Sequence, residues 1–498
     1  MRRWSGSRRA HPATGRRGIR LPAGSGLSAS HDFSGHWLIT QRCPSTNLPV
    51  VPEWSRRLWM NSLLSDINPL DLNLIDAPLL AALYGVTGLV LLLVLLGPTG
   101  VRRAVMTVIG AVVGAAAGWL LAWLVSDVWD PWGVSLSIGT RLWTEALGAS
   151  VAIVLLNLRG QVRWRRVVAM CALPLCLLSA AAGINADVGQ FPTLRVALGL
   201  ASFPQLDQAL ATARSDTLAA GTTTSTGDGI VGTVTIPATV SGFAARPALV
   251  YLPPAATAAN PPALPVVEML SGQPGSPSDV FTAGGLARIL DRYAQAHSGL
   301  APIVVVPDQL GSPTSNPMCV NSARGRVDTY LTIDVPAWIR AHLHVKDQPS
   351  AWTIAGFSQG GTCSIQLGAA HPELYGNILD IAGELVPRNG SEAHTVAAGF
   401  YGDAAAYAAA APAAILAVHA PYTALGAIFV AGDGDPRFLP GVRTLADAAA
   451  RAGVDTHLFV SPGTAHDWHT VDYAWTKALP IIAARTALLA PDNVGMTG

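Results

Sequence analysis

Four long apolar stretches follow one another in the N-terminal half of this chain, and they constrain its fold more than any other feature. They cover residues 77–97, 104–125, 142–158 and 167–184. The first two each have about the 20 residues that a helix needs to cross a bilayer. Half of the 498 residues are hydrophobic and only 13% are charged, which is too apolar for an ordinary soluble domain. The sequence therefore predicts a transmembrane region of about four helices in residues 60–185.

The third stretch is the weakest of the four, because it is short and carries Glu145 near one end. A charged side chain is costly inside a bilayer, so a buried or interfacial helix is the alternative for residues 142–158. Tryptophans gather around the second connection, as is typical of a membrane interface, although helix packing would also explain them. They are Trp119, Trp123, Trp129, Trp132 and Trp143.

The arginines of the short connections predict how the chain crosses the membrane. Arg102 and Arg103 lie in the first connection and four more arginines lie in the third, whereas the second carries two aspartates and only Arg141. Because positive side chains stay in the cytoplasm, we expect the first and third connections there. With four spans, the chain after residue 185 is extracytoplasmic, and losing one span would reverse that side. We predict a multi-pass protein of the cell membrane.

Residues 1–59 are rich in Arg, Ser, Gly and Pro without apolar periodicity, so we expect a disordered tail. No apolar core follows its arginines closely enough for a signal peptide. The arginines of this tail conflict with the predicted orientation, which places the N-terminus outside the cytoplasm. Translation that begins near Met60 would remove the conflict. A mis-called start is therefore the alternative to a disordered tail. Residues 186–228 are expected to be a linker, since Gly, Thr and Ser dominate its end.

The remaining residues, 229–498, alternate short β-rich runs with helical patterns. Hairpin-like strands come first and repeated β-α units follow, an order that predicts an α/β fold with a mostly parallel sheet covered by helices. The expected strands are 230–236, 248–252, 265–270, 302–306, 351–355, 377–381, 427–431 and 456–460. The expected helices are 285–296, 330–342, 359–370 and 442–452.

The strongest local signal is the sequence G-F-S-Q-G at residues 356–360, which follows an apolar strand and leads into a helix. This context is that of a nucleophile elbow, a strained turn that lifts a serine above the sheet. The helix N-terminus beside the serine favours a developing negative charge. Ser358 is therefore the expected nucleophile.

A serine needs a base and an orienting carboxylate to become nucleophilic. His466 lies just after the last predicted strand and is the expected base, with His469, expected in the terminal helix, as its competitor. The acid should follow the preceding strand, where Asp435 is our first choice and Asp433 the second.

Two backbone N–H groups should stabilise the oxyanion. Gln359, the residue after the nucleophile, is expected to supply one. Gln273, in the loop after strand 265–270, is expected to supply the other, because Pro274 has no N–H. An ordinary Gly/Pro turn is the alternative for this loop.

With these residues in place, the chain from about residue 234 to 489 resembles the esterase D-like branch of the α/β-hydrolases, which includes S-formylglutathione hydrolases and the mycolyltransferases of actinobacteria. The resemblance rests on these segments: Leu-Ser-Gly at 270–272, Tyr-Leu at 330–331 through Pro-Ala-Trp-Ile at 336–339, the elbow with His-Pro-Glu at 371–373, and His-Asp-Trp at 466–468 followed by Trp475. The resemblance implies an α/β-hydrolase fold and supports His466 over His469. The predicted multi-pass region that precedes this part of the chain is similar to those of uncharacterised actinobacterial esterases.

Cys319 and Cys363 are the only cysteines of the expected catalytic domain. If that domain is extracytoplasmic, a disulfide between them is expected, and two unrelated thiols are the alternative. No Cys/His cluster suggests a metal site, no motif implies a cofactor, and no broad basic field suggests nucleic acid as a partner.

Together these features predict a membrane-anchored serine esterase or acyltransferase that acts on acyl esters of cell-envelope components, with acyl-ester or lipid substrates. A catalytically inactive binding or scaffold protein with the hydrolase fold is the alternative. A transporter subunit is a third interpretation, which the lack of ionisable residues in the spans other than Glu145 opposes.

Overall fold

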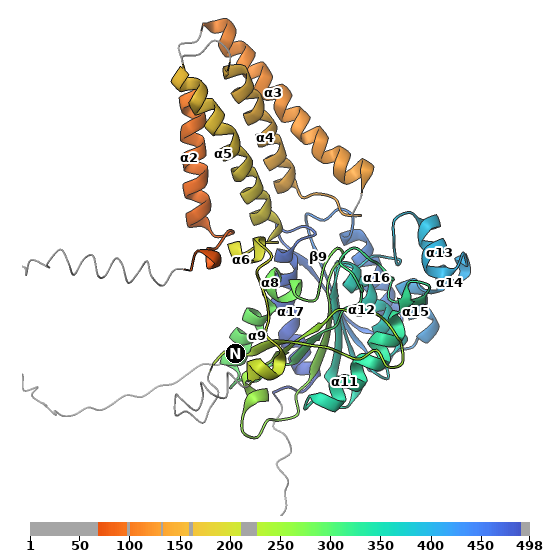
Figure 1. Ribbon diagram of the computed structural model, residues 1–498. Helices are drawn as coiled ribbons and strands as arrows, with labels where there is room; N and C mark the ends of the chain where they lie inside the picture. The colour runs from red at the N-terminus through yellow and green to blue at the C-terminus, as the bar shows by residue number, and fades with distance from the viewer. Residues whose placement is uncertain (1–67, 97–99, 131–132, 159–162, 211–226, 490–498) are drawn as a thin grey trace, which may run out of the picture. The chain divides into compact units, whose positions relative to one another are not determined.

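The computed structural model describes residues 68–96, 100–130, 133–158, 163–210 and 227–489 (Figure 1). These described residues form one compact unit. The predicted tail, residues 1–59, and residues 211–226 of the predicted linker lie outside the described residues.

The four predicted apolar stretches are confirmed as four long apolar helices. They are α2 (Ala77–Leu95), α3 (Val101–Trp123), α4 (Ile138–Asn157) and α5 (Arg163–Val188), and a π-helical turn, η2 (Leu124–Trp129), continues α3. By length and composition each of the four is able to cross a membrane. Most of their large apolar side chains face outward, as a lipid solvent favours.

Glycines bring α3 and α4 into backbone contact. A Cβ atom on Gly114 would lie 2.3 Å from the carbonyl oxygen of Gly148, and one on Gly118 would lie 2.2 Å from that of Thr144. Helices in a bilayer associate through such small residues because van der Waals contact, rather than the hydrophobic effect, holds them together. α4 packs in turn on α5, and α5 packs on α2.

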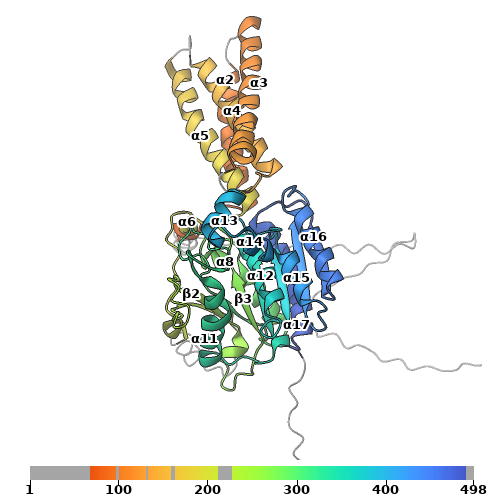
Figure 2. The same cartoon turned by 90° about the vertical axis from the view of Figure 1, so that its right-hand side faces the viewer.

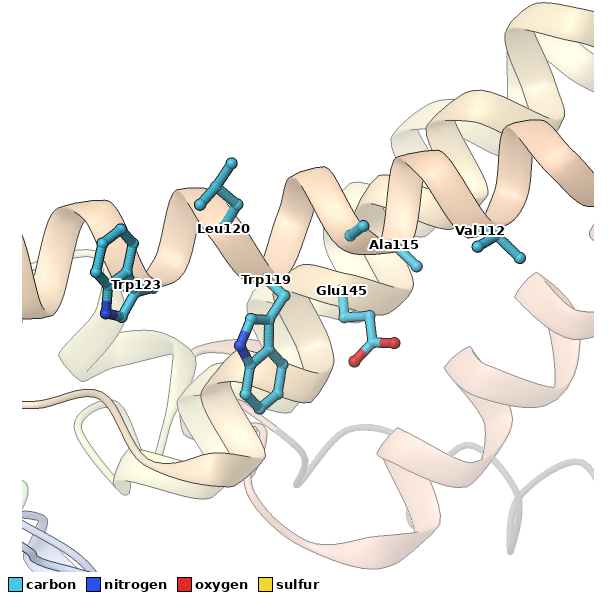
Figure 3. Close-up of a pocket in the computed structure, with 7 residues that line it drawn as sticks. Val112, Ala115, Trp119, Leu120, Trp123 and Glu145 are labelled. Atoms are coloured by element: carbon cyan, nitrogen blue, oxygen red, sulfur yellow. The ribbon is translucent and has the colours of Figure 1, made fainter.

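Glu145, the charged residue of the third stretch, faces a groove of about 710 Å³ beside α3. Figure 3 shows its carboxylate next to the indole of Trp119. The groove is lined by Val112, Ala115, Ala116, Trp119, Leu120, Trp123 and Glu145.

The predicted fold class is confirmed, because the rest of the chain has an α/β-hydrolase fold around an eight-stranded sheet. The strand order is β1-β2-β4-β3-β7-β8-β9-β10. β1 and β2 pair antiparallel, β2 and β4 also pair antiparallel, and every later pair is parallel. The strands are β1 (Ile230–Val234), β2 (Ala248–Leu252), β3 (Val266–Leu270), β4 (Ile303–Val306), β7 (Trp352–Phe357), β8 (Asn377–Ile381), β9 (Gly426–Gly432) and β10 (Asp455–Ser461).

Helices cover both faces of this sheet (Figures 1 and 2). One apolar core lies under α11 (Val335–His342), α12 (Gln359–Ala370), α15 (Pro412–His419) and α16 (Leu439–Arg451). The other lies under α8 (Asp279–Thr282), α9 (Leu286–Ala296) and α17 (Trp468–Arg485). Successive residues of β2 alternate between the cores: Val250 joins the first, and Leu249 and Tyr251 join the second.

Several elements differ from the predicted ones. β1 ends at Val234, two residues early, shortly before Pro237, which has no N–H to offer a sheet. The predicted helix 330–342 is α11 preceded by a short helix, α10 (Val327–Thr329), and a π-helical turn, η4 (Tyr330–Asp334). The helices α13 (Glu392–Phe400), α14 (Ala404–Ala409) and α15 were not predicted, because alanine-rich sequence carries little of the apolar periodicity that marks a helix.

A buried carboxyl group in the middle of β3 makes stability depend on pH. Glu268 is fully buried and accepts a hydrogen bond from the hydroxyl of Tyr375 at 2.8 Å. Burial raises the pKa of Glu268 to about 8, even though the Tyr375 hydroxyl lowers it. A raised carboxyl pKa contributes stability that is complete below the ordinary value of about 4.5 and is lost as the pH rises through about 8.

We therefore expect Glu268→Gln to flatten the fall in stability between pH 5 and 8.5, because glutamine can still accept the Tyr375 hydrogen bond but does not ionise. The midpoint of thermal unfolding in detergent, measured across this range, checks the slope. Glu392→Gln, at an exposed position, is the control and should keep the wild-type slope. Equal slopes in all three proteins would contradict the assignment.

Candidate active site

Ser358 lies in a turn that only glycine neighbours allow. β7 ends at Phe357 and α12 begins at Gln359, and Ser358 between them has φ 59°. A Cβ atom on Gly356 would lie 1.9 Å from the carbonyl oxygen of Gly360, and one on Gly360 would lie 2.4 Å from that of Leu270. A non-glycine residue at positive φ is strained and persists only when its surroundings enforce it. The packing of β7 against α12 supplies that enforcement.

Three of the predicted residues form a hydrogen-bonded chain. His466 Nε2 lies 2.8 Å from Ser358 Oγ, and His466 Nδ1 lies 3.0 Å from Asp435 Oδ2. The side chains of His466 and Asp435 are only 6% and 2% exposed. Such a chain can take the proton from a serine hydroxyl and hold the imidazole in one orientation.

Aromatic rings and a helix cap hold the imidazole in place. The ring of Phe438 stacks on His466 with centroids 4.0 Å apart, and that of Phe357 lies 5.0 Å away. Asp467 caps α17 by accepting the N–H of Thr470 at 2.9 Å. His466 is therefore fixed between the end of a strand and the start of a helix.

The structure separates the second choices from this chain. Asp433 accepts the N–H of Gly463 at 2.8 Å and so links two loops. His469 lies in the first turn of α17, and its Nε2 is 2.8 Å from the carbonyl oxygen of Ala186. Both side chains are engaged in contacts away from Ser358.

The two predicted oxyanion donors follow Ser358 and strand β3, respectively. Gln359 is the first residue of α12, and the first N–H groups of a helix have no acceptor within it. The loop after β3 also approaches the serine, because a Cβ atom on Gly272 would lie 3.6 Å from that of Ser358. Gln273 follows in this loop, and its side chain donates to the carbonyl oxygen of Thr314 at 3.1 Å.

The side chain of Gln359 belongs to a buried network that the sequence analysis missed. Gln309 Nε2 donates to Gln359 Oε1 at 3.0 Å and to the Ser271 carbonyl oxygen at 2.6 Å. Gln359 Nε2 donates to Asn316 Oδ1 at 3.2 Å. Gln309 follows β4 at the edge of the sheet where Ser358 lies, and that position was the signal that could have identified it.

Cys319 and Cys363 form a disulfide that ties the loop after β4 to α12. Cys363 Sγ also lies 3.1 Å from Gln359 Nε2. The disulfide therefore lies directly beside Gln359, the residue that follows Ser358.

Glu384 is an ionisable group beside the site, and the charges of Arg388 and Arg437 act on its pKa. It lies just after β8, and its N–H donates to the hydroxyl of Thr362 on α12 at 2.9 Å. Burial raises the pKa of Glu384 to about 7, against the lowering effect of Arg388 and Arg437.

Among the described residues no group of His, Cys, Asp and Glu is arranged to hold a metal ion.

Comparisons with known proteins place the chain in a family. A family model described as "Putative esterase" matches residues 244–486. An uncharacterized protein of Corynebacterium glutamicum is 31% identical over 360 residues, which are 70% of this chain and 83% of that protein.

Solved structures resemble the hydrolase part. A ferulic acid esterase matches with a TM-score of 0.43 and 17% identity, over 52% of this chain and 98% of that one. An S-formylglutathione hydrolase from Agrobacterium tumefaciens matches with a TM-score of 0.43 and 19% identity, over 52% and 96%. A fluorophosphonate-binding serine hydrolase of Staphylococcus aureus matches with a TM-score of 0.41 and 16% identity, over 53% and 100%.

The two aspartates should differ sharply when each is changed to asparagine. Asp435→Asn is expected to lower kcat for a short-chain ester by about 1000-fold or more, because the imidazole loses its orienting carboxylate. Asp433→Asn should keep kcat within about tenfold and cost about 1 kcal/mol of stability through its weakened hydrogen bond to Gly463. Ester hydrolysis and thermal unfolding check both, and equal losses of kcat would contradict the assignment of the acid.

Removal of the disulfide should cost stability. Cys319 and Cys363 are 44 residues apart, and a loop of this size corresponds to about 2–4 kcal/mol. The double variant Cys319→Ala/Cys363→Ala should therefore unfold at lower denaturant concentration, whereas the control pair Cys171→Ala/Cys176→Ala should respond less. A thiol titration of the denatured wild type should find two more thiols with reductant than without, and equal counts would contradict the disulfide.

Proposed function

Because this chain belongs to the esterase family of α/β-hydrolases, we propose that it is a membrane-anchored serine esterase or acyltransferase that acts on acyl esters of cell-envelope components. The observation that carries the proposal is the continuous hydrogen-bonded chain from Ser358 through His466 to Asp435, with distances of 2.8 and 3.0 Å. A scaffold protein without activity would have no need to keep this chain buried and aligned.

In the proposed reaction Ser358 Oγ attacks the ester carbonyl while His466 Nε2 takes its proton. Asp435 holds the imidazole and stabilises the cation that forms. The N–H groups of Gln359 and Gln273 stabilise the tetrahedral oxyanion. His466 then returns the proton to the leaving alcohol, and water or a sugar hydroxyl accepts the acyl group from the serine.

The substrate class follows from the four apolar helices. Helices of this length and composition hold a catalytic domain at the surface of a bilayer, where acyl lipids and aminoacyl lipids are the local esters. The esterase D-like and mycolyltransferase-like resemblance of residues 234–489 is consistent with transfer between envelope components. We propose that the family placement extends to this branch.

The proposed location of the catalytic domain, residues 229–498, is outside the cytoplasm. The arginines of the first and third connections support this side. The disulfide between Cys319 and Cys363 also supports it, because disulfides persist in oxidising compartments.

Labelling of membranes with a fluorophosphonate probe tests the proposal. We expect a single labelled band for the wild type that is absent for Ser358→Ala and His466→Ala, because both the nucleophile and its base are needed for phosphonylation. His469→Ala is the matched control, and it should keep its label because His469 contacts the carbonyl of Ala186 instead. Labelling that survives Ser358→Ala, or a wild type that does not react, would favour the inactive binding or scaffold protein.

A further inference from the structure

Asp130 lies between two guanidinium groups of the hydrolase domain. It follows η2, the turn that continues α3. Arg437 Nη1 donates to Asp130 Oδ1 at 2.6 Å and Arg437 Nη2 donates to Asp130 Oδ2 at 3.0 Å. Arg388 Nη2 donates to Asp130 Oδ2 at 3.0 Å. The three residues are called the Asp130 clamp below.

The clamp has the geometry of a strong ion pair rather than of an ordinary surface pair. The side chain of Asp130 is 17% exposed, and those of Arg437 and Arg388 are 30% and 38% exposed. Two parallel hydrogen bonds from one guanidinium fix the relative orientation of the partners. A single lysine in place of Arg437 could not reproduce this fork.

Arg437 lies close in sequence to the proposed acid, Asp435, which contacts the proposed base, His466. It lies two residues after Asp435, whose Oδ2 contacts His466 and whose Oδ1 accepts the N–H of Phe438 at 3.1 Å. The ring of Phe438 stacks on the imidazole of His466. A shift of Arg437 would therefore move both the carboxylate and the aromatic ring that hold His466.

Arg388 is connected to Gln359 through hydrogen bonds of Asn316. Its carbonyl oxygen accepts a hydrogen bond from Asn316 Nδ2 at 2.7 Å, and Asn316 Oδ1 accepts one from Gln359 Nε2. Gln359 is the residue whose N–H is the proposed oxyanion donor. Asp435 and Phe438, which lie close to Arg437 in sequence, thus contact His466. The contacts of Arg388 extend to Gln359, the residue after Ser358.

The segment that follows the proposed base contacts the membrane region as well. Trp468 Nε1 donates to Gln190 Oε1 at 2.9 Å, and Gln190 lies just after the end of α5. The loops that carry the proposed acid and base are therefore both held by residues of, or next to, the membrane helices.

We propose that Asp130 is a positioning residue, through which the membrane region sets the geometry of the proposed triad. This inference rests on the proposed esterase or acyltransferase function. It assigns the membrane helices a part in turnover in addition to anchoring.

Steady-state hydrolysis of a soluble short-chain ester by the full-length protein in detergent tests the clamp. We expect Asp130→Asn and Asp130→Ala to lower kcat about tenfold or more while KM changes less than about twofold, because the reacting groups are misaligned and the acyl site is untouched. Asp130→Glu should recover part of kcat by restoring the charge. Arg437→Lys should lower kcat in the same way if Asp130→Ala fails to fold.

Asp127→Asn is the matched control. Asp127 lies in the same turn, but its partner is Arg141 at 2.6 Å, within the membrane region. It should keep the wild-type kcat. Wild-type kcat in Asp130→Asn, an effect on KM alone, or an equal loss in Asp127→Asn would each overturn the clamp.

Failure of the clamp and failure of the proposed function give different results. If the wild type reacts with the fluorophosphonate probe and Asp130→Asn has the kcat of the wild type, only the positioning role of Asp130 is overturned. A wild type that does not react overturns both.

Discussion

The close approach of the start of α12 to the ends of β7 and β3 is the constraint on which the site depends. Gly356 and Gly360 leave no room for a side chain on either side of the serine, and Ser358 accepts a positive φ as a consequence. This contact directs the serine hydroxyl toward the carboxyl edge of the parallel strands. The loops after β9 and β10 reach the same edge, because parallel strands all end there. This shared edge brings Asp435 and His466 to the serine, although both are far from it along the chain.

The parts of the fold that sequence predicted well are those with a local signal. The apolar length of the four helices and the β-α alternation of residues 229–498 each depend on residues close together in the chain. Ser358, His466 and Asp435 were identifiable for a related reason, because each follows a predicted strand, and the structure brings these three within hydrogen-bond distance. Local signals could not decide between Asp433 and Asp435. The distance from each carboxylate to the imidazole depends on how two loops pack.

The parts that sequence did not predict depend on contacts between distant residues. Gln309 and Asn316 look like ordinary loop residues until folding brings them to Gln359. The helices of the alanine-rich segment before β9, α13, α14 and α15, were missed for a different reason. Alanine favours a helix, but the segment has little of the apolar periodicity that marks one, and α14 buries none of its residues. Asp130 was expected only as an acidic residue of a connection, since nothing near it in sequence indicates Arg388 or Arg437. Long-range pairing of charges therefore marks the limit of what the sequence alone could provide.

The distance along the chain between Asp130 and Arg437 also orders the biosynthesis of this protein. The two residues are 307 positions apart, so at about 5–20 residues per second the ribosome needs about 15–60 s to pass from one to the other. The four apolar helices are complete before Ser358 is translated. Of Ser358, Asp435 and His466, the histidine is added last. A chain released in this interval has an unfinished sheet and lacks His466. The hydrogen-bonded chain from Ser358 through His466 to Asp435 can therefore form only in chains that have been synthesised almost to their end.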